Sequence, residues 1–280
     1  MVLGSDGMLG HMIVNTLKTE GVEVHTVSRK DNQDPHHTEL DVSNFENLEN
    51  LIKSVRPSAI INCVGILIIE ADSNPVNAKI INADLPNYLN KLTSIYGFFL
   101  VHASTDCVFS GRSGPYNELS EKDAEDTYGL TKSEGEVWGD NSLTIRTSII
   151  GPDLNINGKG LLNWIMKERG LVTGYSNVLW GGVTTLEFSH FVIYALRNRI
   201  TGLIHLTNGQ SISKMDLLLL IKKSGDLKHI SLVPSPSPVS DRSLVSERND
   251  FLYKVPSYLE MIQELFRYIK NHSQKYMHYQ

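Results

Sequence analysis

Tyr128 and Lys132 stand four residues apart in a segment that we expect to be a helix running to about residue 138. Side chains at this spacing project from the same face, so the ammonium can sit beside the phenol and favour its ionised form. Thr105 follows an apolar strand predicted over residues 98–103, and its hydroxyl could hydrogen-bond the same substrate oxygen. The three groups suit protonation of a carbonyl as hydride arrives. The alternative is a solvent-facing Tyr–Lys pair, so this interpretation requires a dinucleotide site elsewhere.

A glycine-rich turn near the start of the chain predicts that site. Gly4, Gly7 and Gly10 follow a short apolar strand over residues 1–3 and open an amphipathic helix over residues 8–19. Gly4 permits the tight turn, Gly7 lets the backbone approach a pyrophosphate, and Gly10 lets the helix pack closely on the sheet. The alternative is a turn without a ligand. The cofactor contacts predicted in this turn are Gly4, Asp6, Gly7, Met8, Leu9 and Gly10.

The ends of the next strands predict the remaining cofactor contacts. The strand over residues 22–27 ends in Ser28 and Arg29, where an NAD-preferring site usually carries an acid. An Arg suits a 2′-phosphate, so we expect NADPH, with NADH as the second option and a solvated loop charge as the alternative reading. Asp41 and Val42 are placed to lie along the adenine, although Asp41 can equally start the helix over residues 44–54. The buried strand over residues 59–65 adds Cys63, Val64 and Gly65.

Strands and helices alternate as far as residue 149, which predicts a Rossmann-type α/β fold, a right-handed doubly wound parallel sheet. We expect residues 1–150 to form the dinucleotide-binding domain, which also receives later C-terminal elements. Residues 151–280 are expected to be mainly a smaller α/β substrate-binding region. The polar segment 109–126 is predicted to be a loop that could close over substrate.

The composition limits the function classes. The chain has 280 residues, 41% of them hydrophobic and 20% charged, as in an ordinary globular protein. A net charge of -5 gives no basic field for nucleic acid or an anionic membrane, and no apolar run is long enough to span a bilayer. The chain opens on a strand and a glycine turn without a leader pattern, so we expect a cytoplasmic protein. Its two cysteines are expected to be thiols, and His36 and His37 have no metal-ligand partner at useful spacing.

With these residues assembled, the chain resembles the extended short-chain dehydrogenase/reductases, and more closely the dTDP-4-dehydrorhamnose reductase family. The resemblance is carried by the glycine turn, by residues 104–111, 128–136 and 146–148, and by residues 241–244 and 253–258. It implies NAD(P)H-dependent reduction of the 4-keto group of a nucleotide-linked 4-keto-6-deoxyhexose. In that reaction Tyr128 protonates the oxygen, Lys132 lowers the pKa of Tyr128 and binds the nicotinamide ribose, and Thr105 hydrogen-bonds the keto oxygen. Relatives in this superfamily also suggest a homodimer.

Cys107 departs from the family pattern, which usually has Tyr after the Asp of its Thr-Asp-Tyr-Val-Phe motif. In the similar GDP-fucose synthases, a cysteine at the equivalent place is the base that epimerises carbons next to the ketone. We therefore raise the hypothesis of C3 epimerisation before reduction, with Cys107 as the base and Lys159 as the acid on the other face. The alternative is that Cys107 is a small apolar filler under the substrate.

The second half of the chain is expected to hold the sugar and the nucleotide. Arg242 is the candidate for the diphosphate, because a guanidinium can bind it bidentately. The other candidates are Asn163, Trp164 and Trp180, although a tryptophan at helical spacing is more often a core residue. The nucleotide can be UDP or dTDP, and we lean to a UDP-linked 2-acetamido-2,6-dideoxy-hexulose.

Other functions remain open at this point. One is a cofactor-binding regulatory subunit, similar to that of methionine adenosyltransferase, in which the catalytic groups are kept without being used. Another is 4-epimerisation or 4,6-dehydration. A dehydratase needs an acid pair beside the hydroxyl residue, whereas here Asp106 is followed by Cys107.

Overall fold

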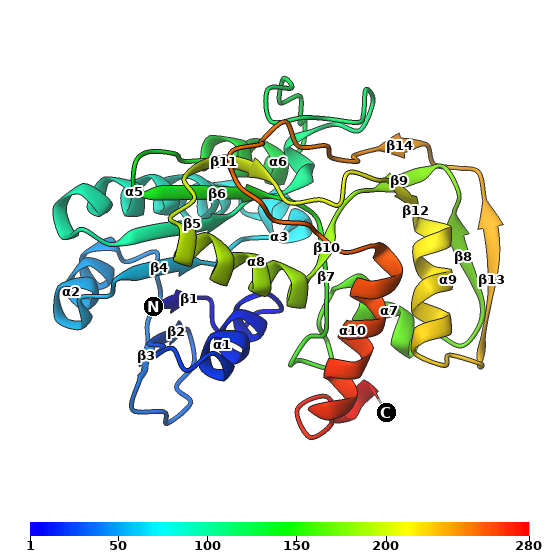
Figure 1. The fold of residues 1–280 in the computed structure, drawn as a ribbon, viewed down its shortest axis with the longest axis horizontal. Helices are drawn as coiled ribbons and strands as arrows, with labels where there is room; N and C mark the ends of the chain where they lie inside the picture. The colour runs from blue at the N-terminus through cyan, green and yellow to red at the C-terminus, as the bar shows by residue number, and fades with distance from the viewer. Residues whose placement is uncertain (280) are drawn as a thin grey trace.

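A seven-stranded parallel sheet forms the centre of the computed structural model, which describes residues 1–279 (Figure 1). Every pair of neighbouring strands in it is parallel. The chain runs outward from an inner strand, the third from one edge, to that edge and then returns to build the other side, so the predicted doubly wound Rossmann-type fold is confirmed. The strands in spatial order are β11 (Gly202–His205), β6 (Ser142–Arg146), β5 (Phe99–Ala103), β4 (Ala59–Asn62), β1 (Val2–Leu3), β2 (Thr26–Ser28) and β3 (His37–Glu39).

Each face of this sheet is buried under its own pair of helices. Neighbouring residues of one strand point to opposite faces, so Val2 and Ile61 belong to one core and Leu3 and Ile60 to the other. The first core packs under α1 (Gly10–Thr19) and α8 (Thr185–Asn198), and the second under α2 (Phe45–Val55) and α5 (Leu85–Tyr96). Burial on both faces explains why the central strands are continuous apolar runs.

The long helix that is expected to follow residue 75 is interrupted. It consists of α4 (Pro75–Lys79), a π-helical turn (Ile80–Asp84) and α5, and the short α3 (Ile68–Ser73) precedes it. Asn82 lies in the π turn and is fully buried. Its amide exchanges hydrogen bonds with the backbone of Ile66 and donates one, 3.1 Å long, to the Thr131 hydroxyl on α6 (Thr127–Glu134). The π turn therefore ties the end of β4 to the helix that carries Tyr128.

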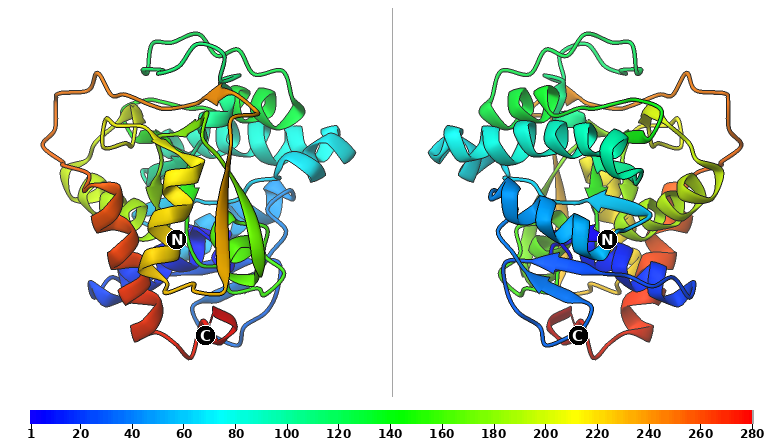
Figure 2. Two further views of the ribbon diagram at one scale, coloured as in Figure 1. Left: turned by 90° about the vertical axis from the view of Figure 1, so that its right-hand side faces the viewer. Right: turned by 90° about the vertical axis from the view of Figure 1, so that its left-hand side faces the viewer.

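A smaller group of strands and helices stands beside the main sheet. A parallel pair, β8 (Gly170–Tyr175) and β13 (Ile230–Ser235), lies next to α9 (Lys214–Ser224) (Figure 2). A second small sheet has the order β12 (Ile212–Ser213), β9 (Val178–Trp180) and β14 (Ser240–Asp241), and β7 (Ile149–Ile150) pairs with β10 (Val183–Thr184). The helix α7 (Leu161–Lys167) precedes β8. Strand β3 and all the strands from β8 to β14 are absent from the sequence-based prediction.

The last part of the chain packs back onto the first. Helix α10 (Tyr258–Asn271) contributes Leu265 to the same core as Met12 of α1. Beyond it, Tyr276 is fully buried, and its hydroxyl lies 2.9 Å from Nε2 of His11. The glycine turn at the start of the chain is thus supported by residues from its far end.

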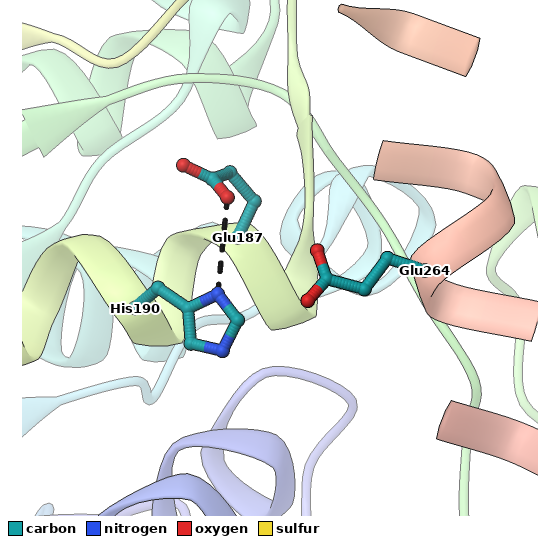
Figure 3. Close-up of side chains that lie close together, drawn as sticks. All are labelled: Glu187, His190 and Glu264. Atoms are coloured by element: carbon teal, nitrogen blue, oxygen red, sulfur yellow. Dashed lines mark ion pairs between the residues drawn. The ribbon is translucent and has the colours of Figure 1, made fainter. Parts of the chain in front are cut away.

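A small acidic cluster joins α8 to α10. Glu187 and His190 on α8 and Glu264 on α10 offer ligand-type atoms that all lie within 4.8 Å of one another (Figure 3). The Tyr253 hydroxyl donates a 2.7 Å hydrogen bond to Glu187, and the Glu187 carboxylate raises the pKa of His190. Within residues 1–279, none of the helices combines the length and the apolar character that a membrane span requires.

Candidate active site

A cavity of about 720 Å³ opens at the ends of β1, β2 and β4. This is the edge of a parallel sheet where such folds bind dinucleotides. Ten of the predicted cofactor contacts line it: Gly4, Asp6, Gly7, Ser28, Arg29, Asp41, Val42, Cys63, Val64 and Gly65. Lys30, Leu154 and Asn155 line it as well, and the sequence did not point to these three.

The glycine turn has the close packing that a dinucleotide site requires. A Cβ on Gly10 would lie 2.1 Å from the Gly4 carbonyl oxygen, so no larger residue fits there. Gly4 has φ of +75°, which glycine adopts without strain. Met8, Leu9 and Gly10 lie outside the cavity wall, and α1 begins at Gly10 instead of residue 8. The Leu9 side chain is buried in the core, so only its backbone could face the cofactor, and its predicted contact stays a prediction.

The outer end of the cavity combines two cations with two acids. Arg29 and Lys30 are exposed on its wall and match a phosphate on the adenosine ribose. The Ser28 hydroxyl donates a 2.7 Å hydrogen bond to Asp6. The Asp41 carboxylate accepts a hydrogen bond from the Ser43 backbone amide, which lowers the pKa of Asp41. Asp41 therefore lines the cavity and also shapes the turn before α2, where Asn44 caps the helix, and its contact with the adenine stays a prediction.

Thr105 and Tyr128 come together because α6 packs tightly against the segment that follows β5. A Cβ on Gly129 would lie 2.3 Å from the Cys107 carbonyl oxygen, so this helix position must be glycine. Asp126 caps the helix by accepting a 2.8 Å hydrogen bond from the Gly129 amide. Burial raises the pKa of the Tyr128 phenol and the Cys107 thiol raises it further, whereas a hydrogen bond with Thr105 acts in the opposite direction. The phenol is therefore protonated at neutral pH.

Lys132 lies on the same helix but contacts β5. Only 3% of its surface is exposed, and its Nζ donates a 2.7 Å hydrogen bond to the Ala103 carbonyl and lies 3.4 Å from His102 Nε2. Burial lowers the pKa of Lys132 to about 8, against the opposing effect of Glu136 and Cys63. The net pKa of Tyr128 is raised by burial, and the expected lowering of that pKa by Lys132 stays a prediction.

Cys107 lies between an acid and a guanidinium. Its thiol is 3.7 Å from Asp106 Oδ1 and accepts a 3.3 Å hydrogen bond from Arg242 Nη1, while its backbone amide donates to Thr105 Oγ1. Burial raises the pKa of Cys107 to about 12, the Asp106 charge adds to this effect, and Arg242 opposes it. The structure therefore brings Arg242, a predicted diphosphate ligand, to the catalytic end of β5.

Lys214 is a second cation near Asp106 and Cys107, and the sequence did not point to it. It is the first residue of α9, and its Nζ lies 5.3 Å from the centre of the Trp180 ring. Burial raises the pKa of the Asp106 carboxyl, and the charges of Lys214 and Arg242 oppose this rise. A lysine in the first turn of a helix opposes the helix dipole. That local conflict is the signal by which the sequence could have revealed it.

Of the other predicted substrate residues, some are buried in the core and some are exposed. Trp180 is buried, and its ring packs against Tyr258, so it is a core residue that supports Lys214. Asn163 is fully buried and donates hydrogen bonds to the carbonyls of Ile156 and Gly158, so its amide shapes the preceding loop. Trp164 on α7 is 39% exposed. Lys159 is exposed on the loop before α7, and within residues 1–279 no recorded contact joins it to Cys107.

The loop over residues 109–126 is fastened to the C-terminal part of the chain. Tyr116 forms a parallel β-bridge with Leu244. The Glu118 carboxylate accepts hydrogen bonds from the His205 amide, the Ser246 hydroxyl and the Glu247 amide, at 2.8, 2.6 and 2.9 Å. These contacts join the loop to the C-terminal part of the chain, and its closure over substrate stays a prediction.

The chain is similar to known reductases. The dTDP-4-dehydrorhamnose reductase of Streptomyces griseus is 30% identical over 155 residues, which are 53% of this chain and 48% of that protein, so the match spans about half of its length. The enzyme of the same name from Salmonella typhimurium is 29% identical over 231 residues, covering 74% of this chain and 77% of the relative.

A solved structure and a family model extend these similarities. The structure of dTDP-4-dehydrorhamnose reductase from Bacillus anthracis in complex with NADP matches with a TM-score of 0.81 and 21% identity, covering 95% of this chain and 98% of that chain. The family model described as the RmlD substrate binding domain matches residues 1–246. The chain therefore belongs to the RmlD substrate binding domain family.

Proposed function

We propose that this protein is an oxidoreductase that uses NADPH to reduce the 4-keto group of a nucleotide-linked 4-keto-6-deoxyhexose. The observation that carries the proposal is the meeting of Thr105 with the protonated phenol of Tyr128, on the same edge of the sheet as the dinucleotide-sized cavity. The family and the names of the relatives support the reaction class.

The chain's own residues supply the proton and hold the reacting oxygen. The nicotinamide would supply the hydride. The Tyr128 phenol donates its proton to the C4 oxygen as negative charge develops there, and the Thr105 hydroxyl hydrogen-bonds the same oxygen. The phenol is suited to this role because its raised pKa keeps it protonated until the substrate carbonyl requires the proton.

The charges on the cavity wall support NADPH as the preferred cofactor. Arg29 and Lys30 both line the cavity beyond the end of β2, where a 2′-phosphate would lie. The close approach of Gly10 to Gly4 provides the turn that a pyrophosphate needs. The relative from Bacillus anthracis was solved with NADP.

We expect a dTDP-linked sugar to be the preferred substrate, because the reductases similar to this chain carry that nucleotide in their names. The UDP-linked 2-acetamido sugar favoured by the sequence is the alternative substrate, to be assayed beside the dTDP-linked sugar. Arg242 and Lys214 are the two cations that reach Asp106 and Cys107 from the second half of the chain, and we assign both to the diphosphate.

The test is sugar-dependent oxidation of NADPH, followed by its absorbance, with dTDP- and UDP-linked 4-keto-6-deoxy sugars. Tyr128→Phe removes the proton donor and is expected to lower kcat by about 10²–10⁴-fold. Tyr96→Phe is the matched control, because it removes a phenol that bonds to Glu49 on the outer helices. Tight NADPH binding without turnover of any of these sugars would refute the reductase and favour the regulatory-subunit alternative.

We further propose C3 epimerisation before reduction, on the basis of one contact. Arg242 Nη1 lies 3.3 Å from Cys107 Sγ, where a guanidinium would stabilise a thiolate that removes the C3 proton. Burial and Asp106 oppose that thiolate by raising the pKa of Cys107, so the base must form with substrate in place. Solvent deuterium should enter C3 with the wild type and not with Cys107→Ser. Equal incorporation in both proteins would remove Cys107 from this role.

A further inference from the structure

A buried chain of polar groups reaches Lys132 from the side of the sheet. It begins at the Val64 backbone amide, which lies 3.1 Å from Asn62 Oδ1. Asn62 Nδ2 is then 3.2 Å from His102 Nδ1, and His102 Nε2 is 3.4 Å from Lys132 Nζ. The side chains of Asn62 and His102 are both fully buried, so water does not compete for these bonds.

The donors and acceptors of this chain have only one consistent arrangement. A backbone amide is always a donor, so the Asn62 atom that faces Val64 must be the oxygen. The nitrogen of Asn62 therefore faces His102 and donates to Nδ1. A neutral imidazole that accepts at Nδ1 carries its hydrogen on Nε2. Burial and the Lys132 charge hold the pKa of His102 well below its usual range, which keeps the ring neutral.

The Nε2 hydrogen points at Lys132, and this decides which form of the lysine is favoured. An amine can accept that hydrogen with its lone pair and still donate to the Ala103 carbonyl at 2.7 Å. An ammonium has no lone pair and would place one of its own hydrogens against the one on the ring. We propose that His102, with its tautomer fixed by Asn62, is a positioning residue that favours the amine form of Lys132, so that the Lys132 ammonium can give up a proton to restore the Tyr128 phenol during the proposed reduction.

The other groups around Lys132 are compatible with this assignment. Glu136 attracts the ammonium, but its carboxylate is bound by Arg146 through Nε and Nη2 at 2.5 and 2.6 Å. Cys63 faces Lys132 from the end of β4, and burial raises the pKa of this thiol to about 12, so it stays uncharged. Tyr128 lies on the same helix and is protonated at neutral pH. His102 is thus the titratable side chain of β5 that contacts Nζ directly, beside the backbone carbonyl of Ala103.

The role of His102 in turnover rests on the proposed function, but the first test of its tautomer is independent of that function. The ¹⁵N chemical shifts of His102 report which ring nitrogen carries the hydrogen. We expect the hydrogen on Nε2 between about pH 6 and about pH 9. In Asn62→Asp the carboxylate accepts from Nδ1–H, so the tautomer should reverse. A wild-type ring protonated on Nδ1 would overturn the proposal, whether or not any sugar is reduced.

The second test is the pH profile of kcat/KM with NADPH and a keto-sugar nucleotide. Activity should fall as Lys132 loses its proton, near pH 8 from the lowered pKa of this residue. The glutamine of His102→Gln can turn its side-chain carbonyl toward the ammonium and stabilise it. The pH at which activity falls on the alkaline side should therefore rise by about one unit. His25→Gln, on the Thr38 side of the sheet, should leave it in place. An unmoved limb in a folded His102→Gln protein would refute the role. Nε2 protonation without turnover of any sugar would refute the reductase instead.

Discussion

Arg29 is the residue from which we expect the clearest effect on cofactor choice. Its guanidinium is exposed on the cavity wall beside Lys30, and a charge-assisted hydrogen bond to a phosphate contributes about 1.5–3 kcal/mol. Arg29→Ala should therefore raise KM for NADPH by about tenfold or more, because 1.4 kcal/mol corresponds to a factor of ten. KM for NADH should change little, since its ribose carries no 2′-phosphate. Steady-state kinetics with both cofactors measure the difference.

The matched control for this substitution is Arg267→Ala. Arg267 is exposed on α10 and does not line the cavity, so it tests the loss of one surface charge alone. Equal losses with NADPH and NADH in Arg29→Ala would contradict a 2′-phosphate contact and would leave Arg29 as a general cofactor contact.

At the scale of single residues, the sequence predicts the positions that follow from spacing. It fails for residues whose contacts and protonation state depend on burial. Gly4, Gly7, Arg29 and Asp41 line the cavity, because the strand-to-helix pattern fixes the position of each. The state of Lys132 could not be read in the same way. Helical spacing puts it on the face of Tyr128, but its contacts are to His102 and Ala103 on β5, and only the folded sheet brings these together.

Glu118 ties the loop over residues 109–126 to the C-terminal part of the chain, so its ionisation affects the stability of a whole element. Burial alone would raise its pKa, but hydrogen bonds from Ser246, Glu247 and His205 outweigh this and lower it. A carboxyl whose pKa is lower in the folded chain stabilises the fold above its unfolded pKa of about 4.3. This stabilisation is lost as pH falls through the folded value.

Glu118→Gln should lower the free energy of unfolding by about 1–3 kcal/mol at neutral pH, because the amide replaces a charged acceptor of three hydrogen bonds. The difference from the wild type should shrink in acid, where Glu118 becomes protonated. Urea unfolding at neutral and acidic pH measures both values. The exposed Glu121 lies in the same loop, and Glu121→Gln is the control. A stability difference between Glu118→Gln and the wild type that does not depend on pH would contradict a role for the Glu118 charge in holding the loop.

The elements that were predicted and those that were missed differ in burial. Strands β4, β5 and β6 are apolar runs because both of their faces are covered, so the sequence shows them plainly. Strand β3 reads His-Thr-Glu at the edge of the sheet and lacks such a run. Strand β8 exposes Leu171, and β13 contains Pro234, which lacks a backbone donor and suits an edge strand. Polar or proline-containing edge strands carry little periodic signal.

The whole molecule brings together residues from both halves of the chain at one edge of the main sheet. Asp106 and Cys107 follow β5, whereas Arg242 follows β14 and Lys214 opens α9. The sequence predicted Arg242 through the resemblance, but periodicity could not show that a helix start would meet the end of β5. A homodimer, which the resemblance implies, stays a prediction.

This arrangement predicts that Lys214 acts on the sugar nucleotide and leaves the cofactor unaffected. Lys214→Met keeps the length of the side chain near Trp180 and removes its charge, so KM for the sugar nucleotide should rise by about tenfold or more. The affinity for NADPH should stay within about twofold, because Lys214 does not line the cofactor cavity.

Lys223→Met on the exposed side of α9 is the control for that substitution. Thermal unfolding of both variants separates a loss of fold from a loss of binding. Since Lys214 stabilises the Asp106 carboxylate, Lys214→Met should also raise the pKa of Asp106 further, and ¹³C chemical shifts of that carboxyl can follow the change. Weaker NADPH binding with an unchanged KM for the sugar would place Lys214 on the cofactor side and would refute its assignment to the diphosphate.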